Sequence, residues 1–174
     1  MIRGLTVDDA TELSAVLVAN REVHAAFVPE RSAHFFTVEG QRRRIEATEH
    51  LYGIFDDGAL AGVIMLSNVV RGPFQSANVG YWVDDARRGR GLATQAVADV
   101  ANLAFGESGL HRLEAGTLVD NLASQRVLEK NGFTRIGVAA HYLRIAGAWR
   151  DHVLFQRTVE DEARGIVRRG GRRD

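Results

Sequence analysis

The residues best suited to chemistry lie in one loop, at residues 81–97, YWVDDARRGRGLATQAV. The loop follows an apolar, β-prone run and enters an Ala-rich segment typical of a helix, where unpaired N–H groups and the helix dipole attract anions. Gly89 and Gly91 allow positive φ and a close approach of a ligand to the backbone. Three neighbouring arginines suit phosphate oxygens: Arg87, Arg88 and Arg90. The loop therefore predicts a site for a phosphate-bearing ligand.

Two common phosphate-binding patterns fit this loop poorly. A P-loop needs Lys followed by Ser or Thr after its glycines, and neither pair occurs here. The dinucleotide fingerprint G-x-G-x-x-G is met at Gly89 and Gly91, whereas Thr94 occupies the third Gly position. Glu114 lies at a tolerable distance for an acid that binds a ribose, so NAD remains an alternative ligand at this point.

The composition predicts an ordinary globular domain. The chain has 174 residues, 45% apolar and 25% charged, with a formal net charge of zero. It contains no cysteine, which excludes a disulfide framework, a Cys-based zinc site and a Cys nucleophile. Neither a signal peptide nor an apolar run near the roughly 20 residues of a membrane span is apparent. We expect a cytoplasmic protein without a membrane or DNA partner.

Alternating and helical patterns predict an α+β, or mixed α/β, domain over residues 1–160, followed by a basic, disordered tail at 161–174. The expected sheet is twisted, mostly antiparallel and mixed, with about seven strands flanked by about four helices. The expected strands are 2–5, 51–55, 59–69, 76–83, 112–119, 133–143 and 149–158, and the expected helices are 6–20, 38–49, 92–105 and 121–130. Several strands precede the Gly-rich loop, whereas a dinucleotide-binding domain has its loop after the first strand, which counts against NAD.

A second motif, VDNLASQRVLEKNGF at 119–133, lies after the strand that follows the loop. Asn121 has the chemistry of a helix cap, and Ser124 lies one turn into the helix. Asn131 and Gly132 are a favourable pair for ending it. By itself this segment predicts only a capped helix leading into a strand.

Together the two motifs resemble the GNAT N-acetyltransferases. Arg88-x-x-Gly91-x-Ala93 is similar to the family's R/Q-x-x-G-x-G/A loop, which binds acetyl-CoA, and Asn121-x-x-Ser124 is similar to its N-x-x-S/A motif. Gly80-Tyr81-Trp82 and the segment 149–151, WRD, resemble the RimJ/RimL-type members, which acetylate protein N-termini, notably of ribosomal proteins. The resemblance covers residues 2–158. It implies acetyl-CoA bound by Trp82, Val83, Arg88, Gly89, Arg90, Gly91, Leu92, Ala93, Thr94, Asn121 and Ser124.

The resemblance also implies catalytic roles. Many GNAT enzymes carry a Tyr seven residues after the motif Asn, as the acid for the leaving thiolate, but Leu128 stands there and cannot donate a proton. We therefore assign that role to Ser124, although a helix Ser can instead bond to a backbone carbonyl. A main-chain N–H near Val83 is the expected donor to the thioester oxygen. For the base, Asp151 is our candidate, with Glu114, His111 and His141 as further options.

The acceptor amine is less closely defined. The strand before the loop carries Asn78 and no acid, which favours an α-amine, with a pKa near 8, over a Lys side chain, near 10.4. We expect a protein N-terminus of the ribosomal-protein kind. Two alternatives stay open: a GNAT enzyme for a small amine (a polyamine, an aminoglycoside or an amino-acid derivative) and a non-catalytic acyl-CoA-binding module. The sequence also leaves a homodimer open.

Overall fold

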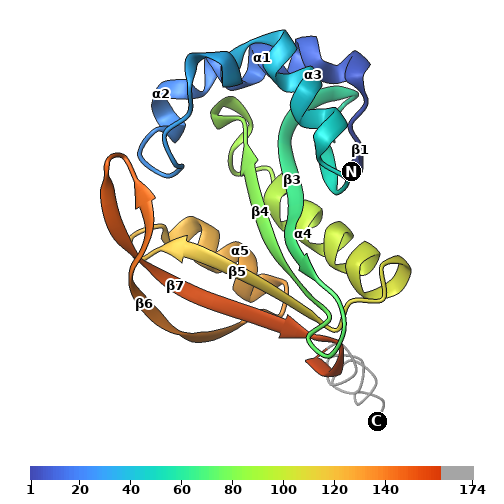
Figure 1. Ribbon diagram of the computed structural model, residues 1–174, viewed down its shortest axis with the longest axis vertical. Helices are drawn as coiled ribbons and strands as arrows, with labels where there is room; N and C mark the ends of the chain where they lie inside the picture. Colours follow the sequence, from blue (N-terminus) through green and yellow to red (C-terminus); the bar gives the residue numbers. More distant parts are fainter. Residues whose placement is uncertain (162–174) are drawn as a thin grey trace.

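Seven strands form one sheet in the order β1-β2-β3-β4-β5-β7-β6 in the computed structural model, which describes residues 1–161 (Figure 1). The strands are β1 Ile2–Gly4, β2 Leu51–Asp56, β3 Ala59–Val70, β4 Ser76–Val83, β5 Arg112–Leu118, β6 Thr134–Ile145 and β7 Ala148–Thr158. β4 and β5 are parallel, and the other neighbouring strands are antiparallel. The predicted mostly antiparallel mixed sheet is confirmed. A doubly wound parallel sheet for NAD is excluded.

The helices lie largely where the sequence predicted them. They are α1 Ala10–Ala19, α2 Arg21–His24, α3 Val38–Ala47, α4 Leu92–Asn102 and α5 Leu122–Lys130, with 3-10 turns at Val7–Asp9, Ala33–Phe36 and Asp85–Arg87. α2 occupies part of residues 21–31, where the sequence predicts either an irregular segment or a second short helix. The predicted helix 92–105 ends as an α-helix at Asn102 and widens into a π-turn at Leu103–Glu107.

Side-chain caps explain where α3 and α5 begin. Thr37 Oγ1 accepts a hydrogen bond from Gly40 N at 3.0 Å, and Asn121 Oδ1 accepts one from Ser124 N at 3.1 Å. Each cap satisfies an N–H group that has no partner within its own helix. The caps fix the first turn of α5, which carries Ser124, relative to the end of β5.

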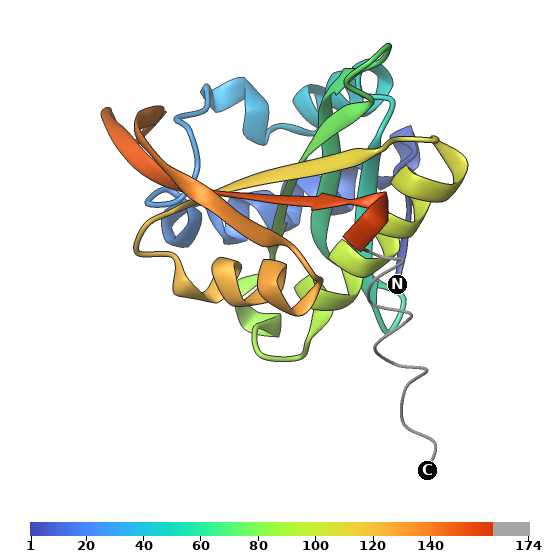
Figure 2. The ribbon, with the colours of Figure 1, turned by 90° about the horizontal axis from the view of Figure 1, so that it is seen from below.

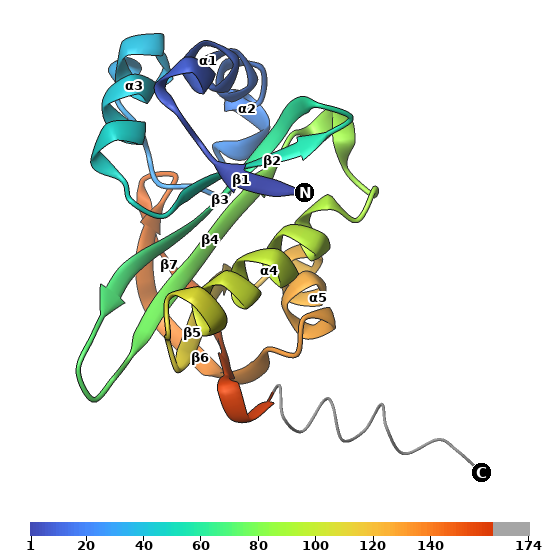
Figure 3. The same ribbon diagram turned by 90° about the vertical axis from the view of Figure 1, so that its right-hand side faces the viewer.

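Helices cover both faces of the sheet (Figure 3). On β3 the buried residues alternate: Val63 packs in a cluster with α1 and α3, and Ile64 packs in a second cluster with α4 and α5. This period of two is the pattern of a strand buried on both faces. The two clusters hold the sheet between a layer containing α1 and α3 and a layer containing α4 and α5.

β6 and β7 form a long hairpin whose tip projects from the body of the molecule (Figure 2). Ala146 and Gly147 turn the chain with φ of 48° and 79°. The hairpin reaches the segment after α2, because a Cβ built on Gly147 would lie 3.5 Å from Glu30 Oε1. Two segments distant in sequence thus lie side by side at the tip of the hairpin.

Within residues 1–161, none of the helices is long and apolar enough to cross a membrane. The basic tail predicted at 161–174 falls almost wholly on residues 162–174, which lie outside the described residues.

Candidate active site

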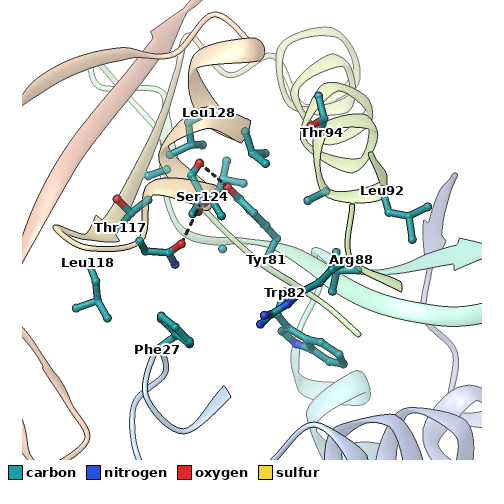
Figure 4. A pocket seen from close by; sticks show the side chains of 18 of the residues that line it. Phe27, Tyr81, Trp82, Arg88, Leu92, Thr94, Thr117, Leu118, Ser124 and Leu128 are labelled. Carbon is teal, nitrogen blue, oxygen red and sulfur yellow. Dashed lines mark hydrogen bonds between the residues drawn. The ribbon is translucent and has the colours of Figure 1, made fainter. Parts of the chain in front are cut away.

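A cavity of about 580 Å³ lies where β4 and β5 part (Figure 4). The two strands pair from Ser76–Arg112 to Asn78–Glu114 and then diverge (Figure 1). The ends of both strands, the loop before α4, the first turns of α5 and the segment after α2 line the gap. Every residue that the sequence predicted for the cofactor lines this cavity.

Main-chain groups at the end of β4 face the cavity. Asp84 N donates to Ala61 O on β3 at 2.8 Å. Because main-chain groups alternate in direction along a strand, the N–H and C=O of Val83 point to the opposite edge, from which β5 has departed. The expected donor to a thioester oxygen therefore lies on the edge of the cavity.

The loop before α4 exposes its backbone in the way that a pyrophosphate requires. Gly89 and Gly91 have φ of 76° and 79°, and a Cβ built on either would meet nothing within 4 Å. Gly91 caps α4, so the N–H groups of the first turn after it have no partner within the helix. These N–H groups and the positive end of the helix dipole suit a negatively charged ligand. The start of α4 therefore fits the pyrophosphate of the predicted CoA cofactor.

The three loop arginines are paired with acids. Arg88 Nε lies 2.6 Å from Asp85 Oδ1, and Arg87 Nη1 lies 2.9 Å from Asp56 Oδ2. Arg90 also pairs with Asp56, whose side chain is 11% exposed. The sequence predicted arginines free to meet phosphate, whereas two of them tie the loop to the turn between β2 and β3. All three guanidinium groups are thus engaged by carboxylates of this chain.

Ser124 Oγ lies 2.7 Å from the Tyr81 hydroxyl, which also donates to Ser124 O at 3.2 Å (Figure 4). Burial raises the pKa of Tyr81 to about 12, and the hydrogen bond to Ser124 partly opposes this. Leu128, one turn further along α5, is fully buried in the core. Sequence reasoning missed the contribution of Tyr81, because the strand pattern shows its face and not its partner on a distant helix.

A second hydroxyl missed by sequence reasoning belongs to Thr117 on β5. Its residue is 6% exposed, and its Oγ1 finds no hydrogen-bond partner among residues 1–161. Buried polar groups are normally paired, so an unpaired one in a cavity wall indicates a polar ligand group. A Thr near the end of β5, whose sequence is RLEAGTL, was the only available sequence signal.

Two histidines from different elements line the cavity. The His24 ring stands edge-on to Trp82, with centroids 5.3 Å apart. Burial lowers the pKa of His24, opposed by a hydrogen bond donated to the Val83 carbonyl. His152 on β7, 3% exposed, also lines the cavity. Among residues 1–161, the lining side chains include no carboxylate.

The bases suggested by the sequence lie elsewhere. Asp151 is exposed, and its Oδ1 accepts from His141 N at 2.8 Å, so its carboxylate supports the β6–β7 hairpin. Glu114 lies 3.5 Å from Arg112, and His111 pairs with Glu160 at 3.0 Å near the opposite end of β5. The geometry brings Ser124 to the cavity and gives Asp151 no place in its wall.

The fold and the site define an acyltransferase. Residues 1–134 match the family described as "Acetyltransferase (GNAT) domain", so the chain belongs to the GNAT acetyltransferase family. The predicted family and the predicted N-acetyltransferase activity are confirmed.

The relatives specify the family branch more closely. The chain is 41% identical to "Probable N-acetyltransferase YjcK" of Bacillus subtilis over 92% of this chain and 95% of that protein. It is 30% identical to "[Ribosomal protein uS5]-alanine N-acetyltransferase" of Escherichia coli, over 88% and 84% of the two chains. The solved structure of RimJ of Mycobacterium smegmatis in complex with CoA-disulfide superposes with a TM-score of 0.88, at 29% identity over 97% of this chain and 88% of that one. These similarities support the RimJ/RimL resemblance and the predicted CoA cofactor.

Proposed function

We propose that the chain transfers the acetyl group of acetyl-CoA to the α-amine of a protein N-terminus, of the ribosomal-protein kind. The observation that carries this proposal is the absence of a carboxylate from the cavity lining within residues 1–161. An acceptor such as a polyamine or a Lys side chain is a cation at neutral pH and needs an acidic site. An α-amine has a pKa near 8, is appreciably neutral, and tolerates such a cavity. The name of the E. coli relative supports the same substrate class.

The donor side of the site follows from the backbone. Main-chain N–H groups from Arg88 to Ala93 would hold the pyrophosphate at the start of α4. Bound acetyl-CoA supplies a thioester whose carbonyl carbon the amine attacks. The Val83 N–H would donate to the carbonyl oxygen as negative charge develops there. Ser124 would donate to the leaving sulfur, since its hydroxyl lines the cavity.

We assign the proton from the amine to His24 in place of Asp151. One ring nitrogen of His24 donates to the Val83 carbonyl, which leaves the other nitrogen as an acceptor in the neutral ring. Burial lowers the pKa of His24, so the neutral form prevails at pH 7. The ring lies beside the backbone of Val83 in the cavity wall.

A substrate panel tests this proposal. Peptides beginning with Ala or Ser, the same peptides with blocked N-termini and an internal Lys, spermine and an aminoglycoside are each incubated with the protein and acetyl-CoA. Release of free thiol is followed, and the product is located by mass spectrometry. Acetylation at the free N-terminus alone supports the proposal. Faster turnover of spermine or the aminoglycoside would identify a small-molecule enzyme, and CoA binding without turnover of any amine would indicate a binding module.

A further inference from the structure

The phenol of Tyr81 and the hydroxyl of Ser124 meet in the cavity wall, 2.7 Å apart (Figure 4). They come from different elements, since Tyr81 lies on β4 and Ser124 lies in the first turn of α5. Both elements are anchored separately. Tyr81 pairs with Ile64 across the sheet, and the Asn121 cap holds Ser124 N at 3.1 Å. The contact therefore joins two rigid parts on either side of the gap.

The hydrogen-bond inventory restricts how the two hydroxyls share their protons. Each hydroxyl has one proton to donate. If Ser124 donates to Tyr81, the phenol donates to Ser124 O at 3.2 Å, and neither proton is available to a ligand. If Tyr81 donates to Ser124 Oγ at 2.7 Å, the Ser124 proton is free to point into the cavity. A sulfur atom carrying developing negative charge favours the second arrangement.

We propose that Tyr81 is a positioning residue, which donates to Ser124 Oγ and directs the Ser124 proton toward the leaving sulfur. This inference deepens the proposed function and rests on it. Because burial raises the pKa of Tyr81 to about 12, the phenol remains a donor throughout the working pH range and is a poor source of a proton itself.

The proton balance of the step closes without ionising Tyr81. As the amine nitrogen bonds to the acyl carbon, the C–S bond breaks and its electron pair goes to sulfur. The sulfur leaves as a thiolate that accepts a hydrogen bond from Ser124 Oγ, and His24 takes a proton from the amine. Solvent carries that proton from His24 to the thiolate, so one proton has moved from nitrogen to sulfur. Tyr81 and Ser124 keep their own protons, and the hydrogen bond from Tyr81 strengthens Ser124 as a donor to the sulfur.

Tyr81→Phe tests the role, because it keeps the ring and removes only the hydroxyl. We expect kcat to fall about 10-fold, the effect of one hydrogen bond, with the KM for acetyl-CoA within about 2-fold of wild type. Ser124→Ala should lower kcat about 100-fold, and the double variant should be no slower than Ser124→Ala alone. Tyr52→Phe is the control, since Tyr52 packs on the same core cluster from β2. Its kcat should match wild type.

A second measurement needs no acceptor. The thiolate of bound CoA is titrated by its ultraviolet absorbance in wild type and in the variants. If Tyr81 acts through Ser124, the pKa of the bound thiol rises by about one unit in Tyr81→Phe, and no further in the double variant than in Ser124→Ala. His24 and His152, which also line the cavity, are unchanged in all of these proteins, so their contributions cancel from the comparison.

The outcomes separate the two proposals. An unchanged thiol pKa in Tyr81→Phe, or effects of Tyr81→Phe and Ser124→Ala that add in the double variant, would overturn the role of Tyr81 and leave the proposed function standing. A wild-type protein that does not bind CoA would overturn both. A protein that binds CoA but acetylates no amine loses the proposed function, and the thiol titration still decides whether Tyr81 directs the Ser124 proton.

Discussion

Replacing Asn20 should lower both the stability of the fold and the affinity for acetyl-CoA. Asn20 lies between α1 and α2 and is 2% exposed. Its Nδ2 donates to Val16 O and to Asp84 Oδ1, both at 2.9 Å, and its Oδ1 accepts from Asp85 N at 2.8 Å. One amide thus ties the first helices to the start of the Gly-rich loop.

Asn20→Leu keeps a side chain of similar volume and removes all three hydrogen bonds. It leaves Asp85 N–H without its partner and takes a donor from the Asp84 carboxylate, which is 21% exposed and regains part of the loss from water. A polar group stranded in this way costs about 1–3 kcal/mol. We expect a total loss of about 3 kcal/mol in the free energy of unfolding, or a fall in Tm of about 6–12 °C at this chain length.

Urea unfolding followed by circular dichroism measures the loss, and titration with acetyl-CoA measures its effect on the donor loop. Asn102→Leu is the matched control, because Asn102 is exposed at the end of α4. Its unfolding free energy should stay within about 0.5 kcal/mol of wild type. A loss below about 1 kcal/mol for Asn20→Leu, or unchanged affinity for acetyl-CoA despite the full loss, would refute the reasoning.

Three further predictions concern pH and the cavity. Arg3 lies 2.7 Å from Asp9 and lowers the pKa of the Asp9 carboxyl to about 2. The ionised Asp9 therefore stabilises the folded protein above pH 4, and this stabilisation is lost as the pH falls toward 2. Asp9→Asn should therefore lower the free energy of unfolding by about 1–2 kcal/mol at pH 7, which is less than the full pKa shift corresponds to, because Arg3 is half exposed. A difference in unfolding free energy from wild type that persists at pH 2 would contradict this. Thr117→Val should leave the free protein as stable or up to about 1 kcal/mol more stable while raising the KM for acetyl-CoA about 5-fold or more, and thermal unfolding with and without CoA checks both. His24→Gln should lower kcat/KM about 100-fold. Protonation of the acceptor amine, with a pKa near 8, lowers kcat/KM in both proteins as the pH falls. Only wild type should show a second, steeper decline below 6.5, because burial lowers the pKa of His24, and a variant that keeps this second decline would exclude His24 as the base.

Much of the fold and half of the site could be predicted because their determinants are local. The turn at Asp57 and Gly58, with φ of 51° and 84°, follows from the residue types alone. The same holds for the left-handed Gly89 and Gly91, whose spacing before a helix indicates an anion site. In these places sequence neighbours are also spatial neighbours.

The rest of the site depends on contacts between distant segments. The pairing of Arg87 with Asp56 spans 31 residues, and that of Tyr81 with Ser124 spans 43. Asp151 illustrates a different limit, since successive residues on a strand face opposite sides. A shift of one position decides whether Asp151 or His152 meets the cavity, and an irregularity in the β6–β7 register lies between Ala139 and Leu143.

The parting of β4 and β5 has a consequence for how such a protein can diversify. The donor site consists largely of main-chain groups, held in place on their far side by the pairing of β4 with β3 from Gly62 to Leu66. A main-chain N–H group is present whatever side chain its residue carries, Pro excepted. The opposite rim consists of side chains on α2, the segment after it and the β6–β7 hairpin, where substitutions alter shape and charge directly. Selection can therefore retune the choice of acceptor on one wall while the other wall continues to bind the same donor.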